Sequence, residues 1–303
     1  MFIKRKIYIN HIRQYYDSNL IKVITGIRRC GKSVLLSQIK DEIEESFSLN
    51  DEHIIWINFE DLKFAKLNTS EKLNNYILKK ITDDHKYYIF LDEIQHVRSF
   101  EKVLASLKAT QNVSLFVTGS NSKLLSGRLA TLLVGRCKEF KIMPFSYSEM
   151  MDFYKENNLE LSSKPFNNYL RFGGMPQRFD YKNEEDIKAY LSDIFYGIID
   201  KDICNSKSKI NKGVFLPIAK YVIANSSKEF SAEKIVEYFN KQNTNSISSK
   251  YVYRYLDKLE QACLINRVNR YDIASKRNLK YIEKQFVIDP GFLLVVNESN
   301  QVS

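Results

Sequence analysis

The chain has 303 residues, of which 44% are hydrophobic and 27% charged, and its formal net charge is +10 at pH 7. These values are ordinary for a soluble globular protein of two or three domains. No run of about 18 apolar residues is present, which excludes a membrane-spanning helix. The N-terminal stretch MFIKRKIYINHIRQYY has no apolar segment of signal-peptide length. We therefore expect a cytoplasmic protein.

The excess of positive charge points to a polyanionic partner or a membrane surface. A genome that favours Lys and Asn codons would produce the same excess, so charge alone does not decide. The cysteines form no C-x-x-C pair, and no histidines accompany them at a zinc-finger spacing. We therefore expect neither a disulfide framework nor zinc.

Strand-like and helical segments alternate through the first half of the chain. The strand-like segments cover residues 20–25, 53–59, 86–91, 113–118 and 138–142, and the helical patterns cover residues 32–46, 70–81, 97–110 and 122–133. The strands within YYIFL and SLFVT are apolar on both faces, as in a sheet that helices cover on both sides. The alternation predicts an α/β fold with a parallel sheet.

The pattern changes near Pro144. Residues 146–203 read as helices interrupted by FGGMPQ, and the polar stretch NSKSKINKG follows. Three further helical patterns then precede two strand-like segments, and these cover residues 214–225, 231–241, 248–262, 264–271 and 279–288. Three helices and a two-stranded wing are the pattern of a winged helix.

A phosphate-binding motif lies between the first strand and the first helix. GIRRCGKS matches G-x-x-x-x-G-K-[ST]. Its glycines let backbone N–H groups face phosphate oxygens, and the following helix presents its positive N-terminal end to the same anion. Lys32 would reach the β- and γ-phosphates, and Ser33 would bind Mg²⁺. We predict an ATP site formed by Gly26, Ile27, Arg28, Arg29, Cys30, Gly31, Lys32, Ser33 and Val34.

Two acidic residues follow the apolar strand of YYIFLDEIQ. Asp92 stands where a carboxylate would hold Mg²⁺, directly or through water. Glu93 is placed to act as the general base that polarises the attacking water. A polar loop after the strand is the simpler alternative, but the acid pair beside a phosphate-binding loop favours hydrolysis as well as binding.

Two later loops supply further candidates. In LFVTGSNS, Ser120 or Asn121 would face the γ-phosphate and orient water, and we take Asn121 as a catalytic candidate. A capped turn is the alternative. In LLVGRCKEF, Arg136 would act as an arginine finger, either within its own chain or in a neighbouring copy. A solvated arginine is the alternative there.

These motifs, together with INFED, LVGR, PFSYSEM, YLRFGGMP, YLSDIFYGIIDKDI, YVYRYLDKLEQACLI and VIDPG, resemble the prokaryotic AAA+ ATPases of the AAA domain 14 type. The resemblance implies a P-loop NTPase fold with a parallel sheet of order 5-1-4-3-2, a helical lid and a C-terminal winged helix. The corresponding domains are residues 1–145, 146–206 and 207–303. It also implies that Gly174 and Pro176 pack on the nucleoside, although a tight turn between helices would use the same residues.

The sequence departs from typical members, which continue into a nuclease-like domain after the winged helix. We expect this domain to be lacking here, through truncation or natural loss, so no nuclease activity is carried over from the resemblance.

The final third of the chain is strongly basic. Residues 207–303 contain 16 Lys and Arg against 9 Asp and Glu, a net charge of +7. The cations of the predicted third helix and wing are Lys250, Arg254, Lys258, Arg267, Arg270, Lys276, Arg277 and Lys280. A winged helix can place such a helix in the major groove of DNA while its wing contacts phosphates. The alternative is a module that packs on the ATPase core or on a protein partner.

The sequence therefore predicts a Mg²⁺-dependent ATP hydrolase that moves its lid and winged helix, with duplex DNA as the expected partner. The alternative is a slow nucleotide-gated switch whose winged helix contacts a protein. A third reading, a DNA-binding regulator with a vestigial nucleotide site, is disfavoured by the intact Lys32, Asp92 and Glu93. A homo-oligomer is also expected if Arg136 acts on a neighbouring copy.

Overall fold

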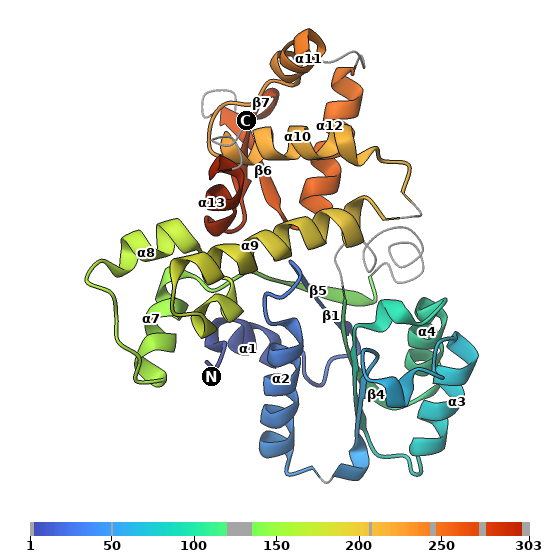
Figure 1. The fold of residues 1–303 in the computed structure, drawn as a ribbon. Coiled ribbons are helices and arrows are strands. Elements are labelled where there is room, and N and C mark those ends of the chain that lie inside the picture. Colours follow the sequence, from blue (N-terminus) through green and yellow to red (C-terminus); the bar gives the residue numbers. More distant parts are fainter. Residues whose placement is uncertain are drawn as a thin grey trace. The chain divides into compact units, whose positions relative to one another are not determined.

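The structure is a computed structural model that describes residues 3–49, 51–119, 135–205, 208–242, 247–272 and 277–298. The chain forms two compact units, Met1–Met143 and Pro144–Ser303 (Figure 1). The finer division of the second unit at residue 206 stays a prediction. None of the helices in the described ranges is long and apolar enough to cross a membrane.

The first unit contains a five-stranded parallel sheet. Its strands lie in the order β2-β3-β4-β1-β5, which confirms the predicted order 5-1-4-3-2. Their bounds are β1 (Ile21–Gly26), β2 (Ile54–Asn58), β3 (Tyr87–Asp92), β4 (Val113–Thr118) and β5 (Cys137–Ile142). Every residue of β1 and β3 is buried, whereas the edge strand β2 alternates between buried and half-buried positions. This is why the central strands read as continuous apolar runs.

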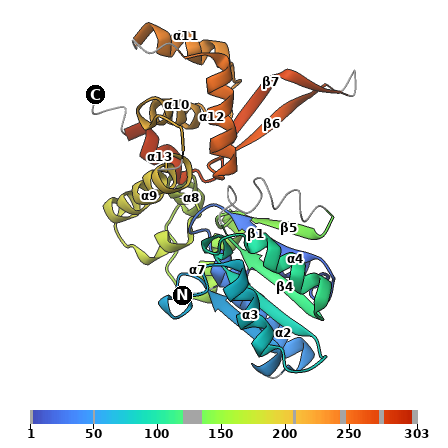
Figure 2. The same ribbon diagram turned by 90° about the vertical axis from the view of Figure 1, so that its right-hand side faces the viewer.

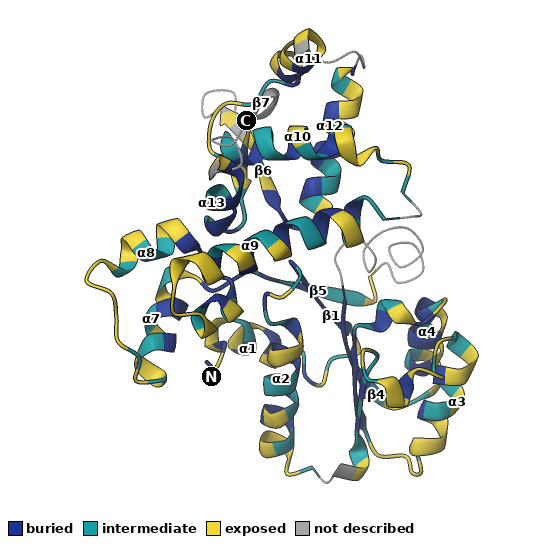
Figure 3. Ribbon diagram, viewed as in Figure 1, coloured by how far each residue is buried: buried dark blue, intermediate teal, exposed yellow. Residues whose placement is uncertain are grey.

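Helices cover both faces of this sheet (Figures 1 and 2). They are α1 (Lys6–Arg13), α2 (Lys32–Phe47), α3 (Ser70–Lys80) and α4 (Phe100–Thr110), with short 3-10 turns η1 (Asp51–His53), η2 (Leu62–Phe64) and η3 (Ile94–His96). One hydrophobic cluster joins α3 and α4 to the strands. The helix α2 buries Leu35, Leu36, Ile39 and Ile43 on the other side. Figure 3 shows the resulting buried layer along β1 and β4.

One predicted helix of this unit begins later than expected, and another lies outside the described residues. The helix predicted over residues 97–110 begins later, at Phe100, because Ser99 adopts a left-handed conformation with φ 56°. The helix predicted over residues 122–133 lies outside the described residues.

The second unit begins with helices only. They are α7 (Tyr147–Glu156), α8 (Pro165–Phe172), the 3-10 turn η4 (Pro176–Asp180), and α9 (Glu184–Ile198), which continues as a π-helical turn η5 (Ile199–Ile203). A capping box starts α7, since the Ser146 hydroxyl accepts from the Glu149 N–H and the Glu149 carboxylate accepts from the Ser146 N–H.

Three helices and a hairpin follow, in the order expected of a winged helix. They are α10 (Lys212–Ala224), α11 (Ala232–Gln242), α12 (Ser249–Gln261), and the antiparallel strands β6 (Ile265–Asp272) and β7 (Arg277–Val287). A further helix, α13 (Gly291–Glu298), was not predicted and contacts α8, α9 and α10. It therefore joins the predicted lid helices to the three-helix module.

The motifs FGGMP and DPG meet at one buried carboxylate. Asp289 accepts the Gly174 N–H on Oδ2 at 2.7 Å and the Gly291 N–H on Oδ1 at 2.9 Å. Burial raises the pKa of Asp289 to about 6, while the two N–H donors and the Arg178 charge act to lower it. A Cβ at Gly174 would overlap the backbone carbonyl of Phe145. Glycine is therefore required here for close backbone packing.

We expect Gly174→Ala to lower the free energy of unfolding by about 1–3 kcal/mol, because the added methyl group must displace backbone atoms. Gly197→Ala is the matched control. It adds the same methyl group in α9, where nothing lies within 4 Å, and should stabilise the helix by up to about 1 kcal/mol. Thermal unfolding followed by circular dichroism distinguishes the two. Equal melting temperatures for both variants would contradict the packing account.

Candidate functional site

The phosphate-binding loop connects β1 to α2. A Cβ at Gly26 would overlap the carbonyl oxygen of Ile142, so no larger residue fits at the end of β1. Gly31 is the N-cap of α2 with φ 94°, and Arg29 has φ 65°. These left-handed positions curl the backbone ahead of the positive end of a 16-residue helix. The loop has the backbone form that an anion-binding nest requires.

Lys32 begins the helix that follows the loop. Its side chain is buried, and its ammonium donates to the carbonyl oxygens of Ile27 at 3.2 Å and Gly26 at 3.4 Å. The charge is therefore held inside the curl of the loop. Among the other predicted loop residues, Ser33 and Val34 are exposed, and Cys30 is fully buried. Burial raises the pKa of the Cys30 thiol, which marks it as a packing residue rather than a reactive one.

The acid pair lies at the end of β3. Asp92 is 1% exposed and accepts a hydrogen bond from the Thr118 hydroxyl. Ser33 also hydrogen-bonds this carboxylate. Burial raises the pKa of Asp92, while the hydrogen bonds from Thr118 and Ser33 oppose that shift. The helix α2 and the strands β3 and β4 thus converge on one carboxylate.

Glu93 occupies a strained backbone position. It has φ 56° and ψ 45°, a left-handed conformation that is uncommon for a residue other than Gly. Its N–H donates to the Thr118 hydroxyl oxygen at 2.9 Å, and its carboxylate accepts from the Gln95 amide. Thr118 therefore hydrogen-bonds both members of the acid pair and fixes the backbone turn at Glu93.

Thr118 was missed by the sequence reasoning, which chose Ser120 and Asn121 from the same segment. Those two residues lie outside the described residues, so their roles stay predictions. The sequence did contain one indication of Thr118, because it is the last residue of the apolar run SLFVT. In the sheet, β4 is the neighbour of both β3 and β1. A hydroxyl at the end of that strand lies beside the ends of the two motif strands.

Arg136 lies directly before β5, at the end of β1 opposite to the phosphate loop. Its carbonyl accepts the Ile21 N–H, and Cys137 pairs with Ile21 at the start of β1. The phosphate loop follows the other end of β1, about 16 Å away along the strand. Arg136 therefore does not belong to the site that its own chain forms, and a role toward a neighbouring copy stays a prediction.

Gly174 and Pro176 lie in the second unit, where Gly174 is held by Asp289 and Pro176 begins η4. The need for glycine at position 174 is explained by close backbone packing within that unit. The predicted contact of these residues with a nucleoside stays a prediction.

The site fits Mg²⁺ and a nucleotide. Hydroxyl and carboxylate oxygens are the ligands that Mg²⁺ prefers, and the Ser33 hydroxyl and the Asp92 carboxylate already lie within hydrogen-bonding distance. The Lys32 ammonium and the turned loop stand beside them. The Ser33 hydroxyl can donate to Asp92 while a lone pair of its oxygen stays available to a cation.

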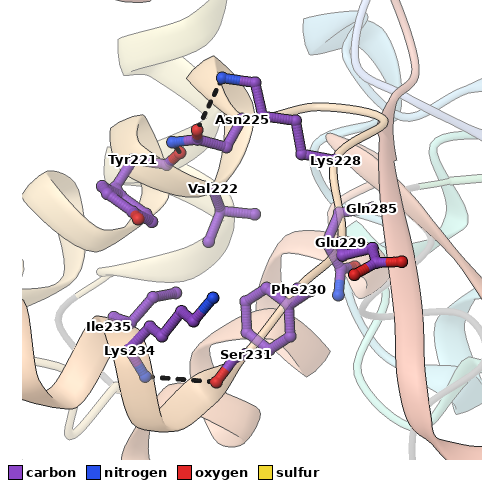
Figure 4. Close-up of a pocket in the computed structure, with 10 residues that line it drawn as sticks. All are labelled: Tyr221, Val222, Asn225, Lys228, Glu229, Phe230, Ser231, Lys234, Ile235 and Gln285. Carbon is purple, nitrogen blue, oxygen red and sulfur yellow. Dashed lines mark hydrogen bonds between the residues drawn. The ribbon is translucent and has the colours of Figure 1, made fainter.

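A separate hollow of about 190 Å³ lies among α10, α11 and β7 (Figure 4). The amide of Gln285 lines it, is 2% exposed, and has no hydrogen-bond partner among the described residues. A carboxamide buried in this way takes its hydrogen bonds from water or a ligand. The lining residues include no histidine, cysteine or aspartate, so we assign no chemistry to this hollow.

Known proteins resemble most of this chain. A family model described as an AAA domain matches residues 18–151, which include the phosphate loop, the acid pair and Thr118. An uncharacterized protein of Haemophilus influenzae is 32% identical over 292 residues, covering 95% of this chain and 72% of that protein. The chain belongs to the AAA domain family.

The part of this AAA protein beyond the AAA domain matches a domain of unknown function over residues 163–302. An uncharacterized protein of Methanocaldococcus jannaschii is 32% identical over 283 residues, covering 89% of this chain and 61% of that protein. The chain thus spans less than two thirds of the archaeal relative.

Two solved structures share the fold of this AAA protein. The Walker-type ATPase of Pyrococcus abyssi is 15% identical, with a TM-score of 0.63 and coverage of 97% of this chain and 96% of that chain. The ORC2 protein of Aeropyrum pernix, solved as ADPNP and ADP complexes, is 12% identical, with a TM-score of 0.50 and coverage of 98% and 93%. At these identities the likeness shows the P-loop ATPase fold.

We expect Thr118→Val to lower the rate of ATP turnover roughly 10- to 100-fold, because Glu93 loses the hydroxyl that positions its turn. Affinity for ATP should change much less, since the phosphate loop is untouched. Thr110→Val, an exposed threonine at the end of α4, is the matched control and should leave both quantities unchanged. Steady-state ATPase assays and nucleotide titration measure the two effects. Wild-type turnover in Thr118→Val would contradict the positioning role.

Proposed function

We propose that this chain is a Mg²⁺-dependent ATP hydrolase of the AAA+ type, and that its three-helix module with the β6–β7 hairpin acts as a winged helix on duplex DNA. The observation that carries the first part is the convergence of Ser33, Asp92 and Thr118 beside the phosphate loop. Phosphate binding alone requires the loop and Lys32. A buried carboxylate followed directly by a glutamate is the additional feature of hydrolysis.

Each residue has a defined role in this proposal. The loop N–H groups from Ile27 to Ser33 and the Lys32 ammonium bind the phosphates. Ser33 and Asp92 hold Mg²⁺, which neutralises charge on the phosphate oxygens when bound. Glu93 accepts a proton from the attacking water, and Asn121 orients that water. Thr118 is a positioning residue because it acts through the turn at Glu93.

The relatives are consistent with nucleotide binding. The Aeropyrum ORC2 protein was solved with ADPNP and ADP, and it shares the arrangement of sheet and helices. We extend nucleotide binding to this chain because its own loop carries Lys32 within a left-handed curl at a helix N-terminus.

Glu93→Gln should retain ATP binding and lower turnover by at least about 100-fold, because the amide cannot accept the proton. Glu71→Gln, an exposed acid in α3, is the matched control. Turnover is measured by phosphate release, and binding by titration with a fluorescent ATP analogue. If Glu93→Gln hydrolyses ATP at the wild-type rate, the assignment of the general base is wrong.

The basic face of α12 supports contact with DNA. Lys250, Tyr251 and Arg254 are exposed on this helix, while Val252, Tyr255 and Leu256 face the module's core. The exposed set therefore presents cations and an aromatic ring together, as nucleic-acid surfaces do. Lys258 is half-buried and donates to Gln261, so it contributes less.

Arg267 is removed from the predicted set of cations that would contact DNA. Its guanidinium pairs with Asp257 at 2.6 Å and Glu260 at 2.8 Å. Two carboxylates neutralise this cation, so Arg267 fixes β6 to α12 rather than offering a free charge. The side chains of Arg270, Lys276, Arg277 and Lys280 lie outside what the structure describes.

The double variant Lys250→Ala/Arg254→Ala should weaken binding to a labelled duplex, and the slope of log Kd against log salt should fall by about 2. Lys79→Ala/Lys80→Ala removes the same charge from the exposed end of α3 and should leave DNA affinity nearly unchanged. Fluorescence anisotropy at several salt concentrations measures both. Equal losses in the two double variants would indicate a general effect of net charge and contradict a DNA-binding helix.

A second candidate function is a nucleotide-gated switch that binds a protein. The observation that favours it is the exposure of large apolar side chains on the same module, including Tyr251 at 48%, Val268 at 46% and Tyr271 at 57%. Exposed aromatic residues are also typical of protein interfaces. Undetectable DNA binding by the wild-type chain would favour this candidate.

The proposed movement concerns the second unit as one body. Asp289, in the segment before α13, holds Gly174 of the lid region, and α13 packs on both groups of helices. We therefore propose that ATP binding and release shift lid and winged helix together. Arg136 would complete the site of a neighbouring copy if the protein assembles into a homo-oligomer.

A further inference from the structure

We propose that His53, Asp83 and His85 form a binding site for a divalent transition-metal ion, for which Zn²⁺ is the appropriate probe. The site is separate from the nucleotide site. It lies before the amino-terminal ends of β2 and β3, whereas the phosphate loop and acid pair follow the carboxyl ends of the strands. Its side chains have no part in the proposed hydrolysis.

The fold brings these three residues together from distant points in the sequence. His53 is the last residue of η1 and immediately precedes β2. Asp83 and His85 lie in the turn before β3. Because β2 and β3 are adjacent and parallel, with Ile54 opposite Tyr88, the segments before the two strands meet at one edge of the sheet. The separation of 30 residues hides this set from any search for a short metal-binding motif.

The distances between candidate ligand atoms suit a metal. The Asp83 Oδ2 atom lies 3.1 Å from His53 Nε2 and 3.4 Å from His85 Nδ1. Two ligands at the ordinary Zn–N or Zn–O distance of about 2.0–2.1 Å in a tetrahedral site are separated by about 3.3 Å. Both measured separations are close to that edge length. All three ligand atoms lie within 4.8 Å of one another, so one ion can reach the set after a small rotation of the exposed His85 ring.

The carboxylate and the first imidazole are held in place by their surroundings. Asp83 Oδ1 accepts the backbone N–H of His85 at 2.9 Å, which turns Oδ2 toward both rings. The His53 ring packs edge-on against Tyr87 with centroids 5.0 Å apart. The Tyr87 hydroxyl in turn accepts the Thr82 N–H at 3.0 Å. These contacts restrict the orientation of the Asp83 carboxylate and the His53 ring, which favours metal binding.

The ligand chemistry differs from that of the nucleotide site. Two imidazoles and one carboxylate suit Zn²⁺, Ni²⁺ or Cu²⁺, whereas Mg²⁺ prefers oxygen ligands alone. Water would fill the remaining position of a four-coordinate ion. The bound ion would tie the start of β2 to the turn before β3, so it should stabilise the first unit without changing the catalytic residues.

The test is a Zn²⁺ titration of the full chain, free of any polyhistidine tag and freed of metal by a chelator. We expect one ion per chain by isothermal titration calorimetry. His53→Gln and His85→Gln should each weaken binding by at least about 10-fold. His11→Gln, an exposed histidine on α1, is the matched control and should bind as the wild type does. Co²⁺ in place of Zn²⁺ should give the intense visible absorption of a four-coordinate site in the wild type and His11→Gln, but not in His53→Gln or His85→Gln.

Two further measurements test whether the variants fold and whether cysteine thiols bind the metal instead. The single tryptophan, Trp56, lies in β2, so its fluorescence reports whether the variants fold and whether Zn²⁺ raises their unfolding temperature. Cys137→Ser/Cys204→Ser should retain binding, because the half-buried thiols are not among the ligands. Unchanged affinity in folded His53→Gln/His85→Gln, or no binding by the wild type at a 100-fold excess of Zn²⁺, would overturn the proposal and leave a hydrogen-bonded surface cluster.

Discussion

The candidate site depends on one constraint: three neighbouring parallel strands of the sheet end at the same edge. These strands are β3, β4 and β1. Their ends carry the acid pair, Thr118 and the phosphate loop. Because Asp92 is withdrawn from water, each hydrogen bond at this edge acts in a medium of low polarity and is stronger than at an exposed site. The same burial raises the pKa of Asp92. The hydrogen bonds from Thr118 and Ser33 act against this shift and favour the ionised carboxylate that a cation requires.

A second constraint organises the C-terminal unit. The buried Asp289 uses both of its oxygens on backbone N–H groups, one from Gly174 and one from Gly291. Glycine is required around it because backbone carbonyls lie too close for a side chain. The two short motifs FGGMP and DPG are therefore two halves of one contact. This contact and α13 join the helices from α7 to α13 in a single compact unit.

Much of the fold could be predicted because the central strands are buried on both faces and read as uninterrupted apolar runs. The phosphate loop and acid pair were predictable because each is contiguous in the sequence. Thr118 was missed because its role comes from the lateral order of the strands, which local sequence does not encode. Whether Arg136 could act within its own chain was left open for the same reason, since only the register of β5 with β1 shows at which end of the sheet it lies. The helix α13 was missed because GFLLVVNE contains two adjacent valines and begins with glycine, both poor signals for a helix.

Coupling between the two units is tested most directly by ATP turnover of the purified chain, measured with and without duplex DNA at two salt concentrations. A DNA-coupled ATPase predicts Mg²⁺-dependent turnover that rises with DNA at low salt, with a stimulation that fades at high salt as phosphate contacts weaken. Turnover that is unaffected by DNA at both salt concentrations would contradict the coupling. A protein would then be the favoured partner of the proposed winged helix. Absence of Mg²⁺-dependent turnover under all four conditions would contradict the role assigned to the acid pair itself.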